Sequence, residues 1–109
     1  MISWEDFEKL DVRTGTIMEA WPFEKAKKPA YKLKIDFGKA GIKNSSAQIT
    51  TLYKTNELIG KQIIAIINFP PKQIADFMSE CLILGVYNEQ KEIILLQPER
   101  QTENGNKIG

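Results

Sequence analysis

The clearest pattern in the sequence is a strict alternation of apolar and polar residues between positions 31 and 37. Successive side chains of a β-strand point to opposite faces, so this alternation predicts a strand with one buried and one exposed face. The apolar positions are Tyr31, Leu33, Ile35 and Phe37, and the polar positions are Lys32, Lys34 and Asp36. A turn over residues 38–41 and an antiparallel return strand over residues 42–49 are predicted to follow.

The segment before this strand divides into a short helix, a strand and a loop. Ser3 is a candidate N-cap, and Asp6 provides a weaker form of the capping box. A helix that ends near residue 11 is predicted by the apolar stripe Trp4, Phe7 and Leu10. Residues 12–20 have strand character, and Gly15 within them suggests a bulge or a bend at a barrel corner. Two prolines mark residues 21–30 as a loop.

The second half of the chain predicts a helical turn, a buried strand and a hairpin. Thr55 is a candidate cap for a turn of helix that Gly60 closes. Residues 62–68 are apolar on both faces, as expected of a fully buried strand. The remainder is predicted as an irregular segment over 69–81, a hairpin of residues 82–87 with 92–97, and an ordered or half-ordered polar tail from 98.

Five or six short strands with one or two small helices predict an all-β chain in which residues 1–109 form one domain. The favoured architecture is a five-stranded OB-fold barrel with short helices and N- and C-terminal extensions, and an SH3-like barrel is the alternative. OB-folds bind ligands on the face of strands 2 and 3 and in the adjoining loops. This rule points to residues 31–37 and 42–49, with the loops at 21–30 and 69–81.

Composition limits the chemistry that such a barrel can perform. The chain has no histidine and only one cysteine, Cys81, so the common nucleophile pairs, His-containing metal sites and paired-cysteine zinc sites are excluded. It also lacks a Gly-rich phosphate loop and any metal-ligand spacing among its acids. We therefore expect a binding protein that is not an enzyme and that has no catalytic residue, metal or cofactor.

The charged residues are distributed unevenly along the chain. The formal net charge is only +1, but residues 25–43 contain seven lysines and one aspartate. That segment carries +6, which leaves −5 for the rest of the chain. Such asymmetry is typical of a surface that meets phosphate or an acidic partner, and a solvated lysine-rich face is the alternative explanation.

Several residues in these regions are candidates for ligand contacts. Lys32 and Lys34 project from the polar face of one strand and can reach one ligand backbone. Asn68 ends a buried strand, where its side chain needs a hydrogen bond, so it is interpreted first as a brace for the following loop. Phe69 and Phe77 either line a peptide pocket, stack on a base or close the barrel end. Trp4 is interpreted as a lid over the barrel or as part of a dimer seam.

Four segments, in order along the chain, resemble the tRNA-binding-domain family of OB-fold modules. Within this family the chain looks most like the CsaA-type bacterial protein-export chaperones. The resemblance covers essentially the whole chain. The segments are residues 28–33 (KPAYKL), 45–50 (SSAQIT), 68–74 (NFPPKQI) and 104–108 (NGNKI).

The resemblance implies a homodimer that binds either tRNA or, as in CsaA-type members, unfolded preproteins in hydrophobic pockets. The wider family carries Ser-x-Gly-Met where this chain has Ser79-Glu80-Cys81-Leu82. Losing the glycine removes backbone access, and Glu80 repels phosphate, which argues against strong tRNA binding. The sequence and the resemblance together predict these nucleic-acid or peptide contacts: Lys32, Lys34, Lys43, Ser45, Ser46, Gln48, Asn68, Phe69, Lys72, Gln73, Phe77 and Ser79.

The expected role is that of a chaperone that binds unfolded preproteins and serves the export machinery, with tRNA binding through the lysine-rich face as the alternative. No stretch has the roughly 18 apolar residues that a membrane span needs. The N-terminus is acidic and lacks the order of a signal peptide, so a cytoplasmic location is expected.

Overall fold

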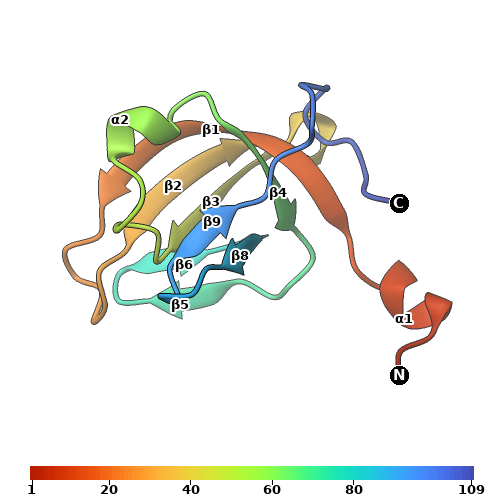
Figure 1. Ribbon diagram of the computed structural model, residues 1–109, viewed down its shortest axis with the longest axis horizontal. Helices are drawn as coiled ribbons and strands as arrows, with labels where there is room; N and C mark the ends of the chain where they lie inside the picture. The colour runs from red at the N-terminus through yellow and green to blue at the C-terminus, as the bar shows by residue number, and fades with distance from the viewer.

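One long strand, β1 (Val12–Pro22), holds the two halves of the main sheet together. Its first half pairs with β4 (Gln62–Ile66) and its second half with β2 (Tyr31–Asp36), both antiparallel. The computed structural model describes residues 1–109. With β3 (Ile42–Ala47) and β7 (Leu82–Ile83), the strand order of the five-stranded sheet is β3-β2-β1-β4-β7. Figure 1 shows how this sheet curls on itself.

Backbone pairing between β3 and the chain just before β7 nearly closes the sheet into a barrel. The Glu80 amide donates to the Asn44 carbonyl, and the Asn44 amide donates to Glu80 Oε1, both at 2.8 Å. One residue further on, Ser45 Oγ donates to the Cys81 carbonyl at 3.0 Å. The five-stranded antiparallel barrel with short helices confirms the predicted OB-fold architecture.

The barrel is filled by side chains that the alternating patterns place inward, among them Leu33, Ile35 and Phe37, all fully buried. Gly15 lies directly under this cluster, because a Cβ at that position would be 2.6 Å from the Phe37 ring. Pairing of β1 with β4 is regular from Val12 to Thr16, so the predicted bulge does not lie at Gly15, and the residue permits a close approach instead. The register shift of β1 falls between Ile17 and Glu19, within its pairing with β2.

The N-terminal helix α1 (Trp4–Glu8) begins with the predicted capping box but ends earlier than expected. Ser3 Oγ accepts from the Asp6 amide at 3.1 Å, and Asp6 Oδ2 accepts from the Ser3 amide at 3.0 Å. No residue of α1 is buried, and Trp4 is 84% exposed. Figure 1 shows α1 projecting from one end of the barrel, so the interpretation of Trp4 as a lid is wrong. No helix has the length and apolar character needed to cross a membrane.

The segment between residues 69 and 81, predicted as irregular, contains a second small sheet. β5 (Lys72–Ile74) pairs with β6 (Phe77–Ser79) in a hairpin whose turn includes Ala75 at φ 53°. Two prolines and strands of three residues leave too short a pattern to distinguish this hairpin from a loop. The correction matters because this hairpin lies beside the end of β3.

The remaining elements agree with the sequence in kind and differ at their ends. A 3₁₀ turn, η1 (Gly38–Ala40), joins β2 to β3, and the predicted late hairpin is formed by β8 (Gly85–Tyr87) with β9 (Ile93–Leu95). The helix α2 (Thr55–Leu58) has Lys54 as its N-cap, so the prediction that Thr55 caps it is wrong. Thr55 is the first helical residue instead.

The polar C-terminal segment is ordered and packs against β1. Gly105 donates its amide to the Thr14 carbonyl at 2.7 Å, and the Thr14 amide donates to the Asn106 carbonyl at 3.0 Å. Thr16 Oγ1 donates to Asn104 Oδ1 at 2.7 Å. Gly105 has φ 88°, and a Cβ there would overlap the Phe37 carbonyl, so the close packing of the tail depends on this glycine.

Candidate functional site

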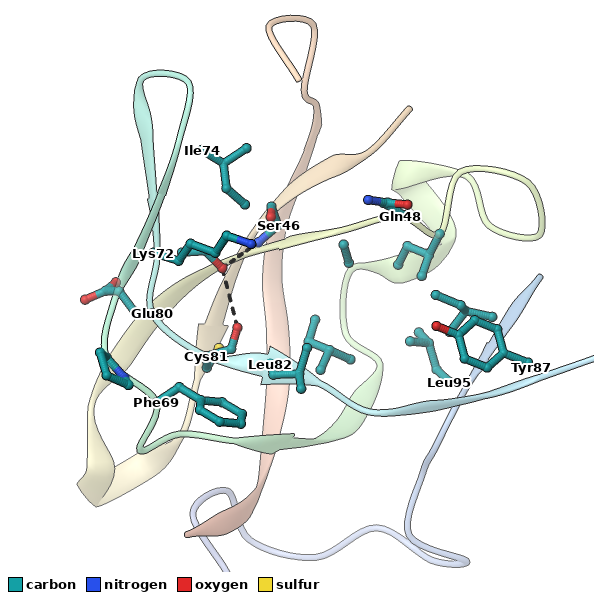
Figure 2. A pocket seen from close by; sticks show the side chains of 16 residues that line it. Ser46, Gln48, Phe69, Lys72, Ile74, Glu80, Cys81, Leu82, Tyr87 and Leu95 are labelled. Atoms are coloured by element: carbon teal, nitrogen blue, oxygen red, sulfur yellow. Dashed lines mark hydrogen bonds between the residues drawn. The ribbon is translucent and has the colours of Figure 1, made fainter. Parts of the chain in front are cut away.

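A groove of about 590 Å³ lies between the β5–β6 hairpin and the β8–β9 hairpin. Figure 2 shows Ile74 and Lys72 on one side, Tyr87 and Leu95 on the other, and Leu82 between them. Ten of the sixteen lining residues are hydrophobic. The groove therefore lies where the sequence predicted a ligand site, at the end of β3 and along the segment 69–81.

Several large apolar side chains that line this groove are exposed to solvent. Phe69 and Leu82 are each 48% exposed, and Tyr87 is 74% exposed. Polar groups gather at the edges, including Gln48 and two residues of opposite charge, Lys72 and Glu80. An apolar floor with a few polar groups at its rim is typical of a site that binds an organic ligand or a peptide side chain.

The structure brings five of the twelve predicted contact residues together in this groove. They come from three parts of the chain, namely Ser46 and Gln48 from β3 and its end, Phe69 and Lys72 from the chain around β5, and Ser79 from β6. The Ser46 amide donates to Ser79 Oγ at 3.2 Å, which ties β3 to the hairpin (Figure 2).

The predicted lysines do not form one row. Lys32 is paired with Ser46 across β2 and β3, so both side chains lie on the outer face of the barrel, as does that of Lys34 two residues further on. Lys43 is paired with the buried Ile35, so it leaves the sheet on the opposite face. A single phosphate backbone on the outer face can thus meet Lys32 and Lys34, but not Lys43.

The side chains of three other predicted contact residues make hydrogen bonds within the protein. Ser45 is fully buried, and its hydroxyl is used at the barrel seam, so it cannot reach a ligand. Asn68 accepts from the Asp11 amide at 2.9 Å and donates to the Lys9 carbonyl at 2.7 Å, so it holds the junction of α1 and β1. It braces the start of the chain and not the loop that follows it. The Gln73 side chain donates to the Ala75 carbonyl at 3.2 Å, within its own hairpin.

The last predicted residue, Phe77, lies at the tip of the β5–β6 hairpin, beside the groove. Its ring packs edge to face against Phe23 of the β1–β2 loop, with ring centroids 5.5 Å apart. Lys32 Nζ is 5.7 Å from the centroid of each ring. Lys25 Nζ and Asp76 Oδ2 are 2.9 Å apart. This hydrogen-bonded pair raises the pKa of Lys25 and lowers the pKa of Asp76.

Much of the groove escaped the sequence analysis. Tyr87, Ile93 and Leu95 come from the β8–β9 hairpin, which was predicted as a hairpin but not as part of a site. A signal was present, because this hairpin has apolar residues on both faces, and Val86 remains 50% exposed. An exposed apolar strand face in a short hairpin indicates a surface that contacts something else.

The single cysteine of the groove is a poor nucleophile, and no cluster of metal ligands is present. Burial raises the pKa of the Cys81 thiol to about 11, so it is a protonated and weak nucleophile at neutral pH. No group of three or more His, Cys, Asp or Glu residues could hold a metal ion. The arrangement can bind by burial of apolar surface and by hydrogen bonds from its rim.

A family comparison identifies the class of domain that has this architecture. The family model described as "Putative tRNA binding domain" matches residues 12–107, from the start of β1 into the C-terminal segment. The protein belongs to the tRNA-binding-domain family. Its OB-type barrel and the resemblance found in the sequence agree with this membership.

Relatives in this family include domains of much longer enzymes. A methionine–tRNA ligase of Methanococcoides burtonii is 34% identical over 108 residues, which cover 99% of this chain and 16% of the ligase. One from Bacteroides fragilis is 34% identical over 107 residues, with 98% and 16% covered. The chain thus spans 16% of the length of these relatives, so the similarity carries no ligase activity with it.

Solved structures of chaperones match this tRNA-binding-type domain over its full length. The CsaA chaperone protein from Picrophilus torridus is 55% identical with a TM-score of 0.94, and each chain is covered completely. The chaperone CsaA from Bacillus anthracis is 50% identical with a TM-score of 0.95, covering 100% of this chain and 99% of that one. Together these findings support a tRNA-binding or CsaA-type role.

Proposed function

We propose that this protein is a non-catalytic chaperone that acts as a homodimer and binds unfolded preproteins on behalf of the export machinery. The observation that carries the proposal is the apolar groove, in which Phe69, Leu82 and Tyr87 are substantially exposed. Similarity to the two CsaA chaperones over their whole length supports the same role.

The chemistry of the groove suits an extended polypeptide. Burial of apolar surface contributes about 25 cal/mol per Å², so one leucine or phenylalanine side chain seated in the groove contributes roughly 1.5 to 3 kcal/mol. Ser46 and Gln48 at the rim offer neutral donors and acceptors, which suit a peptide backbone of any sequence. Lys72 and Glu80 bring both signs of charge, so the site selects against neither acidic nor basic segments.

Apolar surface outside the groove supports the homodimer. Trp4 is exposed on a helix with no buried residue, and Val86 and Ile94 form an exposed apolar pair across β8 and β9. A second copy would cover such surface, which a monomer leaves in water. Sedimentation equilibrium at micromolar concentration is expected to give twice the mass of one chain, and a mass of 12.4 kDa would contradict this part of the proposal.

The groove is tested with a fluorescein-labelled, reduced and carboxymethylated polypeptide that stays unfolded. We expect Phe69→Ala and Leu82→Ala each to weaken binding about tenfold, which is about 1.4 kcal/mol. Ile59→Ala is the matched control, since Ile59 is 53% exposed but does not line the groove. Binding that is undetectable in the native protein, or equally weakened by all three substitutions, would contradict the proposal.

A second function, binding of tRNA through the lysine-rich outer face, is favoured by family membership. Lys32 and Lys34 share that face, but Lys34 Nζ already lies 3.8 Å from Glu19 Oε2, and Lys25 is paired with Asp76. These internal partners reduce the positive charge available to phosphate. The groove is therefore the favoured site, and the outer face is the alternative.

Salt distinguishes the two functions. Affinity for bulk tRNA falls steeply between about 50 and 200 mM salt if phosphate contacts dominate, because counterions are released. Apolar binding of the unfolded polypeptide is maintained under the same change. Loss of tRNA binding in Lys32→Ala and Lys34→Ala, but not in Lys39→Ala, would favour the alternative. A cytoplasmic location is part of either proposal and is tested by cell fractionation.

A further inference from the structure

The β5–β6 hairpin forms one wall of the groove, with β6 beside β3, and its specific contacts with the barrel lie at its base and at its tip. At its base, Ser79 Oγ accepts from the Ser46 amide at 3.2 Å, and the Glu80 amide continues the pairing with β3. Between base and tip, β5 pairs only with β6, so its outer edge has no strand partner. Two prolines without amide hydrogens, Pro70 and Pro71, precede it. Displacement of the hairpin about its base would therefore break no strand pairing of the five-stranded sheet.

At its tip, the hairpin is held by a set of contacts with the β1–β2 loop and β2. We call this set the clasp. It consists of the edge-to-face rings of Phe23 and Phe77, the Lys32 ammonium at 5.7 Å from both rings, and the exposed ion pair of Lys25 with Asp76. No contact of the clasp is needed to form the barrel, which is closed through β3 and residues 80–81.

We propose that the clasp is a latch that sets how far the groove is open. The inference rests on the proposed function, because the groove is the site it regulates. With the clasp made, β5 holds Ile74 and Lys72 against the groove and limits access to its floor (Figure 2). With the clasp released, the hairpin swings outward and admits a longer stretch of unfolded chain.

The two kinds of contact in the clasp contribute differently. Only 4% of Phe23 is exposed, so the aromatic contact contributes most of the free energy that stabilises the clasp. The Lys25–Asp76 pair is exposed, and such pairs are weak and screened by salt. It therefore adjusts the latch and makes it sensitive to ionic strength. Lys32 is a positioning residue of the clasp in this arrangement, with its ammonium directed to aromatic rings.

Cys81 provides a reporter of opening that needs no ligand. It is the only cysteine, it lines the groove, and it is 6% exposed. A disulfide reagent such as 5,5′-dithiobis(2-nitrobenzoate) reacts with the thiolate. One sulfur of the reagent joins Cys81 Sγ, and the other leaves as a coloured thiolate that is measured by absorbance. The rate of this reaction in the native protein measures how often the groove opens.

The test compares labelling rates of full-length variants at pH 8.5 and low salt. We expect Phe77→Ala to raise the rate about tenfold or more and Asp76→Lys about threefold, while Asp76→Lys with Lys25→Asp returns it to within about twofold of the native rate. The matched controls are Met78→Ala, an exposed neighbour outside the groove, and Lys27→Asp, a loop lysine without an ion-pair partner. Circular dichroism confirms that each variant is folded.

The outcomes separate this inference from the proposed function. Labelling rates within about twofold for all variants, or an equal rise in Met78→Ala, would overturn the latch. A rise in labelling together with faster association of the unfolded polypeptide supports both proposals. A rise in labelling in a protein that binds no polypeptide supports the latch and contradicts the chaperone function. Polypeptide binding that is independent of the clasp, with unchanged labelling, leaves the function and overturns the latch.

Discussion

Two adjacent serines, Ser45 and Ser46, are expected to have opposite roles, and replacing each by alanine tests the structure most directly. Ser45 is fully buried and donates to the Cys81 carbonyl at 3.0 Å across the seam that closes the barrel. The Ser46 side chain is half-buried at the groove rim, and only its backbone amide bonds Ser79. Ser45→Ala should therefore affect stability, and Ser46→Ala should affect ligand binding.

The size of the stability change follows from the hydrogen bonds at the seam. Without the Ser45 hydroxyl, the Cys81 carbonyl keeps only Ser79 Oγ, at the longer distance of 3.5 Å. Loss of one hydrogen bond that leaves a buried acceptor with only a long remaining bond costs about 1 to 2 kcal/mol. For a domain of this size that corresponds to a fall in Tm of about 4 to 8 °C. Ser46→Ala, which removes no side-chain hydrogen bond of the fold, is expected to stay within about 0.5 kcal/mol of the native protein.

The assay is urea unfolding followed by tryptophan fluorescence. All proteins are compared at one concentration, because the stability of the proposed homodimer would depend on protein concentration. The unfolded polypeptide used above gives the binding constant of each variant. Ser46→Ala should weaken that binding about threefold, and Ser45→Ala, where folded, should leave it unchanged. A Ser45→Ala variant as stable as the native protein, or less disturbed than Ser46→Ala, would falsify the assignment of the two residues.

Three further substitutions or conditions test the fold. Gly15→Ala places a methyl group 2.6 Å from the Phe37 ring, and the overpacked core should lose about 1 to 3 kcal/mol in thermal unfolding. Asn68→Ala should speed hydrogen exchange over residues 4–11, since both side-chain bonds that hold α1 are lost, while amides of β1 and β4 stay protected. The unfolded Cys81 thiol loses its proton near pH 9 and the folded one near pH 11, so stability is complete below pH 9. It should then fall by about 2 to 3 kcal/mol up to pH 11, a loss absent from Cys81→Ala.

The strands with regular patterns were predictable because successive side chains of a strand point to opposite faces, so the order of apolar and polar residues shows which face is buried. The alternation over residues 31–37 identified β2 and its buried side, and the apolar run at 62–68 identified β4. The capping box of Ser3 and Asp6 identified the start of α1, because it is a local interaction between neighbours in sequence. The β5–β6 hairpin was not predictable in this way, since its three-residue strands and two prolines resemble a loop.

The candidate site was predicted in part for the same reason. The segments that form the groove were identified, and Ser46, Gln48, Phe69, Lys72 and Ser79 do line it. Ser45 was included with its neighbour, although strand parity turns it inward, and the rim contributed by β8–β9 was missed. Whether a serine or lysine on a strand meets solvent depends on the register with its partner strand and on the segments that pack over it, which local sequence patterns do not fix.

The sequence by itself determined the all-β class and the family, because strand periodicity and several short motifs are local properties of the chain. The tertiary structure decided which of the predicted polar residues line the groove and which the barrel encloses. The pairing of β3 with β2 sends Lys32 and Lys43 to opposite faces, and the seam with residue 81 takes Ser45 out of solvent. These outcomes depend on the register of β3 with β2 and, for Ser45, on a contact with Cys81 more than 30 residues away. Local sequence patterns encode neither.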